Sequence, residues 1–307
     1  MPIFRINHLT TYRYSRAVRF GEHRMMLRPR ESYDQRLIEA TLTITPEPVS
    51  LRWTNDVFGN AIAIARFDAK AEELAFRSKV TVEHSPLNAP DFMIDDAALN
   101  YPFVYPPDEA PDLEPWTAIG DSESNSEVDS WTQQFLQGQR PIETGRLLMT
   151  ITNAIKESFT YVRRAEPGTQ TPAETLASGS GSCRDYAVLM IAAMRRLGLA
   201  ARFVSGYVYT GVEGERRGGG STHAWCQVYL PGAGWVDFDP TNGIVGNRDL
   251  IRVAVGREPM QAVPLSGQYS GSVDDRAAMN VEVDVRRLEQ RPAGNGALAG
   301  SGKIGEK

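Results

Sequence analysis

Residues 179–194 read GSGSCRDYAVLMIAAM and decide how the second half of the chain folds. Glycine and serine residues form a loop, and Cys183 then opens a run whose side chains are apolar on almost every side. A helix of that composition is buried, because no face of it prefers water. We therefore predict a buried helix from Cys183 to Leu197, ended by Gly198.

The predicted helix places Cys183 at its N-terminus, where the backbone dipole favours an anion. A free thiol has a pKa of about 8.5, and a helix N-terminus together with a neighbouring histidine lowers it to roughly 6. The thiol of Cys183 is then largely ionised and nucleophilic at neutral pH. The alternative interpretation is a small buried side chain at a helix start, which is the usual environment of a lone cysteine.

Of the four histidines in the chain, His223 has the position that best suits a base. His8 and His84 lie in strand-like runs and His23 lies in a polar segment, so we interpret these three as structural or surface residues. His223 opens a strand over residues 222–230, directly after a glycine-rich loop, and a side chain at a strand end can reach a cleft. A histidine packed against an aromatic neighbour is the alternative.

A turn at residues 231–234, Pro-Gly-Ala-Gly, joins this strand to the next one as a hairpin. In a register without a bulge, Asp239 points away from His223. With a bulge at Gly234, Leu230 faces Gly234, and Asp239 becomes the diagonal neighbour of His223 on the same face of the sheet. We predict the bulged register, because it lets the carboxylate reach the imidazole.

Three side chains then form a candidate catalytic triad. Cys183 supplies the nucleophile, His223 the base, and Asp239 the carboxylate that orients the base. Cys226 faces the opposite side of its strand from His223, and we assign it to the core. This orientation disfavours a disulfide with Cys183 and a redox-sensing role for the two cysteines.

The length of 307 residues suggests two packed units, with one large domain as the alternative. Residues 1–90 alternate apolar and polar side chains in short runs, which predicts an N-terminal β-rich, sandwich-like domain. Residues 91–120 are rich in proline and read as an extended connector. Helical patterns and then strands over residues 121–290 predict a catalytic domain, and residues 291–307 resemble a disordered tail. The predicted fold class is α+β.

The composition excludes several classes of protein. Hydrophobic residues make up 41% of the chain and charged residues 23%, enough to build a core. The net charge of -5 is spread along the chain, so nucleic acid is not an expected partner. The longest apolar run has nine residues, which is too few for a membrane span, so we expect no membrane partner. The first residues do not resemble a secretion signal, so we expect a cytoplasmic location. No metal cluster or phosphate loop appears, and no metal or cofactor is expected.

Four ordered motifs resemble the transglutaminase-like superfamily of papain-type cysteine enzymes. They are GSCRDYA at 181–187, VSGY at 204–207, HAW at 223–225 and GWVDFDPTNG at 234–243. In addition, HLTTYRY at 8–14 and RMMLRPR at 24–30 are similar to the β-rich domain that precedes this core in a bacterial branch of the superfamily. The resemblance covers the chain up to about residue 260.

The resemblance implies a papain-like core in which Cys183, His223 and Asp239 act on amide bonds through a thioester. No tryptophan upstream of Cys183 matches the side-chain oxyanion donor of the family. The backbone N–H of Cys183 can supply one donor, because it lies at the start of the helix.

We expect a hydrolase of amide or peptide bonds with a peptide or protein substrate, and the oligomeric state stays open. The alternatives are an acyltransferase that uses an amine acceptor and a non-catalytic peptide-binding module. Asp185 and Trp225 are the expected substrate-binding residues, although stabilisation of the helix dipole also explains Asp185. The run from Arg216 to Gly220 suits a mobile lid, a flexible loop or an anion cradle.

Overall fold

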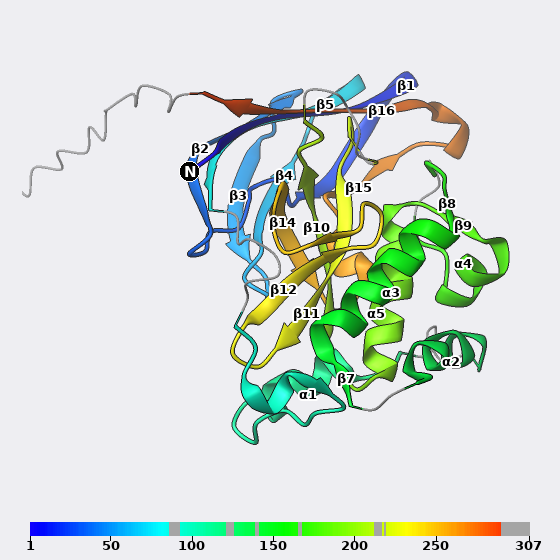
Figure 1. Ribbon diagram of the computed structural model, residues 1–307. Coiled ribbons are helices and arrows are strands. Elements are labelled where there is room, and N and C mark those ends of the chain that lie inside the picture. Colours follow the sequence, from blue (N-terminus) through cyan, green and yellow to red (C-terminus); the bar gives the residue numbers. More distant parts are fainter. Residues whose placement is uncertain are drawn as a thin grey trace, which may run out of the picture.

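The computed structural model describes residues 1–85, 93–120, 126–138, 141–164, 168–211, 217 and 219–289. Its fold is α+β, as predicted, with a β-rich N-terminal region followed by a core of helices packed on a second sheet (Figure 1). The predicted tail at 291–307 lies outside the described residues, as does the start of the predicted connector.

Five consecutive strands form most of the N-terminal sheet. They are β1 (Ile3–Met25), β2 (Gln35–Thr45), β3 (Ser50–Asn55), β4 (Ala61–Arg66) and β5 (Lys70–His84), arranged in the antiparallel order β2-β5-β1-β4-β3. The alternation of apolar and polar residues, which predicted the strands, also determines which of their side chains are buried. Phe4 and Ile6 of β1 point into the core, whereas Arg5 between them is exposed.

Two C-terminal strands complete this sheet. β15 (Leu265–Ser270) and β16 (Arg276–Leu288) both pair with β1, and Ile3 lies opposite Leu288 (Figure 1). The sequence pattern suggested that these strands belong to the second unit, at residues 121–290. An alternating pattern indicates a strand but does not identify its partner, and here the partner is the first strand of the chain.

The second sheet has five antiparallel strands. They are β10 (Ala201–Val208), β11 (His223–Leu230), β12 (Gly234–Asp239), β13 (Ile244–Val245) and β14 (Leu250–Gly256), in the order β13-β12-β11-β10-β14. Leu230 lies opposite Gly234, which is the bulged register predicted from the sequence. Gly234 has a φ of 71°, a left-handed conformation that glycine adopts without strain.

Helices cover one face of this sheet. α5 (Cys183–Arg196) packs on β10 and β11 and is almost entirely buried, and α2 (Ser126–Gln133), α3 (Thr144–Ser158) and α4 (Pro172–Ser178) lie around it (Figure 1). The opposite face of the sheet packs on the N-terminal sheet, where Phe4, Ile6 and Val82 meet Tyr207 and Ile251. The molecule therefore has two β layers and one helical layer.

The proline-rich segment is more ordered than the extended connector predicted for it. It contains η1 (Asp96–Ala98), β6 (Asn100–Tyr101) and α1 (Ala110–Thr117). Pro111 lies in the first turn of α1, where the missing N–H costs no helical hydrogen bond. The remaining short elements are η2 (Gln134–Leu136), β7 (Ile142–Glu143), β8 (Thr160–Tyr161), β9 (Ser180–Gly181), η3 (Pro259–Ala262) and η4 (Val273–Asp275).

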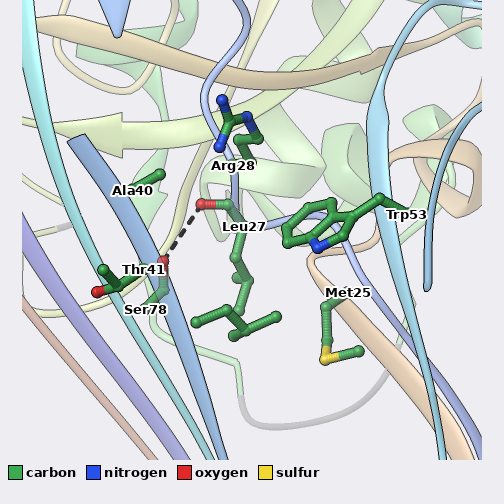
Figure 2. Close-up of a pocket in the computed structure, with 8 residues that line it drawn as sticks. Met25, Leu27, Arg28, Ala40, Thr41, Trp53 and Ser78 are labelled. Atoms are coloured by element: carbon green, nitrogen blue, oxygen red, sulfur yellow. Dashed lines mark hydrogen bonds between the residues drawn. The ribbon is translucent and has the colours of Figure 1, made fainter. Parts of the chain in front are cut away.

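A pocket opens on the N-terminal sheet, away from the helices. Figure 2 shows its lining side chains, which are Met25, Leu27, Arg28, Ala40, Thr41, Leu42, Trp53 and Ser78. This lining includes no cysteine, histidine or carboxylate, so we look for the chemistry on the second sheet. Among the described residues, none of the helices has the length and apolar character needed to cross a membrane.

Candidate active site

Cys183 is the first residue of α5, as predicted. The residue is buried, with 7% of its surface exposed, and it lies at the positive end of the helix. The helix starts here because Asp185 binds the preceding residue. The backbone N–H and the hydroxyl of Ser182 donate to Oδ2 of Asp185 at 2.8 and 2.7 Å. This is half of a capping box, and it fixes the backbone at the nucleophile.

Asp185 is fully buried and also binds two loops. Its Oδ1 accepts hydrogen bonds from Nη1 of Arg164 at 2.9 Å and from the backbone N–H of Gln170 at 2.7 Å. The carboxylate thus joins three chain segments around the start of α5. It offers no exposed surface to a substrate, in contrast to the substrate-binding role expected from the sequence.

His223 and Asp239 form a buried hydrogen-bonded pair. Nε2 of His223 lies 2.8 Å from Oδ2 of Asp239, and both side chains are sealed from solvent. Asp239 also accepts from the backbone N–H of Thr241 at 2.9 Å and from Nδ2 of Asn242 at 2.8 Å. The bulged hairpin register puts these two strand residues on one face, which is why the pair forms.

Charge pairing decides the protonation of this pair. Burial alone would lower the pKa of His223, but the charge and hydrogen bond of Asp239, together with Cys183, raise it to about 10. Burial would raise the pKa of Asp239, but the charge and hydrogen bond of His223 outweigh it and hold that pKa below its usual value. An imidazolium facing a carboxylate is therefore the favoured state at neutral pH.

The second imidazole nitrogen, Nδ1, is not bound to Asp239. Nδ1 of His223 is buried and has no hydrogen-bond partner in the described part of the chain. The Cys183 sulfur interacts with the same ring and raises its pKa. Asp239 and Cys183 thus both interact with the His223 ring, which groups the three side chains of the candidate triad.

Trp225 is the indole that packs on the imidazole. Its ring stacks on His223 with 5.9 Å between centroids and 27° between planes, and its Nε1 donates to Oδ1 of Asp237 at 2.6 Å. The side chain is fully buried. Trp225 therefore contacts the base and not the solvent, which differs from the expected substrate-binding role.

Tyr161 belongs to the site, and the sequence analysis missed it. It lies on β8, opposite Gly181 of β9, and is half-buried. Burial and the nearby charge of Cys183 raise the pKa of its hydroxyl to about 12, so the group stays protonated and can donate. The signal in the sequence was a tyrosine before the loop that leads to Cys183, a residue type that can donate a hydrogen bond as tryptophan does.

Asn242 is a second residue that the sequence analysis did not single out. Its Oδ1 accepts from the backbone N–H of Arg217 at 2.9 Å, while its Nδ2 donates to Asp239. The guanidinium of Arg217 lies 6.0 Å from the ring centroid of Tyr161. Arg217 therefore lies at the site, and Arg216 is outside the described residues, so the anion cradle expected from both arginines stays a prediction.

Cys226 lies in the core of the second sheet, as expected, and is fully buried. Burial raises the pKa of its thiol, which keeps it protonated. Both cysteines are free thiols. In the described ranges, no three or more His, Cys, Asp and Glu side chains are grouped to hold a metal ion.

Comparisons with known proteins identify relatives of both halves. Residues 4–83 match the bacterial transglutaminase-like N-terminal region, and residues 129–240 match the transglutaminase-like superfamily. An uncharacterized protein of Mycobacterium tuberculosis is 30% identical and covers 93% of each chain. An uncharacterized protein of Mycobacterium leprae is 26% identical, over 92% of this chain and 98% of the relative.

A solved structure has the same fold. It is that of a protein from Cytophaga hutchinsonii, described as a candidate cysteine protease. It superposes with a TM-score of 0.68 at 18% sequence identity and covers 94% of this chain and 92% of the other. At this sequence identity the likeness establishes the fold and does not establish the reaction.

Proposed function

Since the chain belongs to the transglutaminase-like superfamily, we propose that it is a cysteine-dependent hydrolase of amide or peptide bonds. One observation carries the proposal. The imidazole of His223 is bound to Asp239 through Nε2, its Nδ1 is buried without a hydrogen-bond partner among the described residues, and the ring interacts with Cys183 at a helix N-terminus. That arrangement suits a thiol whose proton has moved to the imidazole.

The first half of the reaction forms a thioester. The thiolate of Cys183 attacks the carbonyl carbon of the amide, and the C–O double bond opens to an oxyanion. The imidazolium of His223 then gives its proton to the amide nitrogen, the C–N bond breaks, and an amine leaves. Asp239 holds the ring in place and stabilises its positive charge.

Two donors can stabilise the oxyanion. The backbone N–H of Cys183 belongs to the first turn of α5, whose N–H groups have no partner within the helix. The hydroxyl of Tyr161 is the second candidate, because it stays protonated beside the sulfur. Together they fill the role for which no upstream tryptophan is matched, with each donor expected to contribute about 100-fold in rate.

The second half releases the acid. The neutral imidazole of His223 takes a proton from water, the hydroxide oxygen attacks the thioester, and the thiolate of Cys183 leaves. An amine that replaces water in this step gives acyl transfer. We favour water, because we identify no dedicated amine site around Cys183 among the described residues. The protease-like fold of the Cytophaga hutchinsonii protein supports a peptide or protein as substrate.

Mass spectrometry of the trapped acyl-enzyme tests the proposal. The purified chain is incubated with a peptide mixture, with and without added lysine, and quenched in acid to preserve thioesters. We expect a mass adduct on Cys183 and hydrolysed peptides in both reactions. Cys183→Ala should lose the adduct and the products, and Cys226→Ala should keep both. An adduct that turns into a lysine conjugate would assign acyl transfer, and its complete absence would reject covalent catalysis.

A further inference from the structure

A buried series of polar side chains connects the N-terminal region to the imidazole of His223. Asp34, between β1 and β2, pairs with Nη2 of Arg252 on β14. Nη1 of Arg252 lies 2.9 Å from Oδ2 of Asp237 on β12. Oδ1 of Asp237 accepts the indole N–H of Trp225 at 2.6 Å, and that indole stacks on His223.

Every member of this series is buried. Asp34 and Asp237 are 2% exposed, and Arg252 is 8% exposed, so water does not compete for their hydrogen bonds. The planar guanidinium serves both carboxylates at once, which an ammonium on a flexible stem does not reproduce. Burial by itself would raise the pKa of Asp34, but the charge of Arg252 and its hydrogen bonds hold that pKa below its usual value. The carboxylate is therefore ionised and directed at Arg252.

The residue after Asp34 is fixed to β14 by hydrogen bonds between its side chain and the backbone of Arg252. Nε2 of Gln35 donates to the carbonyl oxygen of Arg252 at 2.8 Å, and Oε1 of Gln35 accepts the backbone N–H of Arg252 at 2.9 Å. Ser32 and Asn247 donate to the carboxylate of Asp34. The N-terminal region thus holds both the backbone and the side chain of Arg252.

The imidazole needs such support. Asp239 fixes one atom of the ring through Nε2, and one hydrogen bond leaves the tilt of the ring about that bond undetermined. The stacked indole supplies the second constraint, since its plane limits the plane of the imidazole. The indole is in turn oriented by its hydrogen bond to Asp237.

We propose that Asp34 is a positioning residue for the catalytic base, acting through Arg252, Asp237 and Trp225 to aim the His223 ring at Cys183. This inference rests on the proposed function, in which His223 serves Cys183. The N-terminal region would then take part in the chemistry, although Asp34 is far from His223 along the sequence. If the ion pairs only joined the two sheets, their loss would lower stability without changing the reactivity of the thiol.

Asp34→Asn removes the charge with little change in volume, and Asp275→Asn is its matched control. Asp275 also belongs to the N-terminal sheet region and forms a two-pronged pair with Arg16, at 2.8 and 3.0 Å, but has no connection to Arg252. Both variants are made in a Cys226→Ala background, so that Cys183 is the single thiol. The readouts are the second-order rate of alkylation by iodoacetamide at pH 7 and the NMR resonance of the His223 ring protons.

We expect Asp34→Asn to alkylate about five-fold more slowly than its parent. The His223 resonance should move as well, because the ring current of Trp225 acts on it. Asp275→Asn should leave both readouts unchanged. Parental alkylation and an unmoved resonance in Asp34→Asn would overturn the inference, as would equal effects in the two variants.

A double-mutant cycle tests the route through the indole. Trp225→Phe keeps an aromatic ring but loses the N–H that binds Asp237, so it should slow alkylation by itself. If Asp34 acts through Trp225, adding Asp34→Asn to Trp225→Phe causes no further loss, whereas independent effects multiply. If the slowing factors of the two single variants multiply in the double variant, Asp34 does not act through Trp225. Circular dichroism verifies that each variant folds, and if Trp225→Phe does not fold, the rate and resonance of Asp34→Asn decide alone.

His223→Gln separates this inference from the proposed function. If His223→Gln alkylates as its parent does, the base does not activate Cys183, and both proposals fail. If His223→Gln slows alkylation while Asp34→Asn does not, only the positioning role fails.

Discussion

Tyr161 lies opposite Gly181 in the parallel pair formed by β8 and β9, so its ring is held beside the loop that leads into Cys183. The backbone N–H groups of Thr160 and Val162 donate to the carbonyls of Gly179 and Gly181, both at 2.9 Å. This short pair fixes the backbone of Tyr161 beside the loop that precedes Cys183, and the charge of Cys183 acts on the Tyr161 hydroxyl.

Replacing Tyr161 with Phe separates oxyanion stabilisation from thiol reactivity. Hydrolysis of an activated amide forms an oxyanion, and we expect kcat to fall about 100-fold with KM little changed. Alkylation by iodoacetamide forms no oxyanion and should proceed at the parental rate. Tyr269→Phe is the control, because Tyr269 lies on β15 of the N-terminal sheet and its hydroxyl donates to the carbonyl of Ser272. Equal slowing of both reactions would show that Tyr161 affects the thiol instead.

The two cysteines should differ strongly in reactivity. Cys183 lies at the helix start beside the imidazole, whereas burial raises the pKa of Cys226 and seals it in the core. We expect iodoacetamide to label Cys183 in the native chain and to leave Cys226 unlabelled until the chain unfolds. Peptide mapping of the alkylated protein measures the two rates. Equal labelling of both thiols under native conditions contradicts the proposed activation.

The pH dependence of stability should report the pairing of His223 with Asp239. The folded pKa of His223, about 10, exceeds the unfolded value of 6.5. Its contribution to stability is therefore fully present below pH 6.5, and it declines as the pH rises toward 10. The decline should reach about 1.4 kcal/mol per pH unit, the linkage slope for one proton.

Urea denaturation from pH 6 to pH 10 measures this contribution. The comparison uses Cys183→Ala with and without His223→Gln, so that the thiol does not titrate. The stability difference between the two variants should narrow as the pH rises. A difference that stays constant across this range would mean that the imidazole is neutral in the folded chain.

Replacing Asp185 with Asn tests whether this residue binds substrate or supports the loops. Loss of the buried carboxylate leaves Arg164 and Ser182 with a poorer partner, and we expect a loss of about 3 kcal/mol in unfolding free energy. Asp284→Asn, in an exposed pair with Arg286, should change little. Unchanged stability with a raised KM would instead restore the substrate-binding role for Asp185.

Local patterns were sufficient to predict the central part of the site. The apolar run after Cys183 predicted the helix, and the glycine turn with its period of two predicted that Asp239 faces His223. The apolar run and the glycine turn each lie within a few residues of the helix or hairpin that they predict. The chemistry of the three side chains suggested the roles of nucleophile, base and orienting carboxylate, and the resemblance to a known family implies the same roles.

Contacts between distant segments were not predictable in the same way. Asp34 and Arg252 are separated by 218 positions, and no periodicity relates them. Tyr161 lies on a two-residue strand, which is too short to show an alternating pattern. The helix at Ala110–Thr117 was missed because its prolines suggested an extended chain, although a proline in the first turn is compatible with a helix.

The pairing of β1 with β16 has a consequence for biosynthesis. The first described strand to leave the ribosome pairs with the last, so the N-terminal sheet closes only when translation has passed Leu288. Until then the backbone N–H and C=O groups along one edge of β1 are unpaired, and this edge can pair with other nascent chains unless chaperones cover it. The same proximity of Ile3 and Leu288 makes the chain a good candidate for circular permutation, with new ends cut into a surface loop.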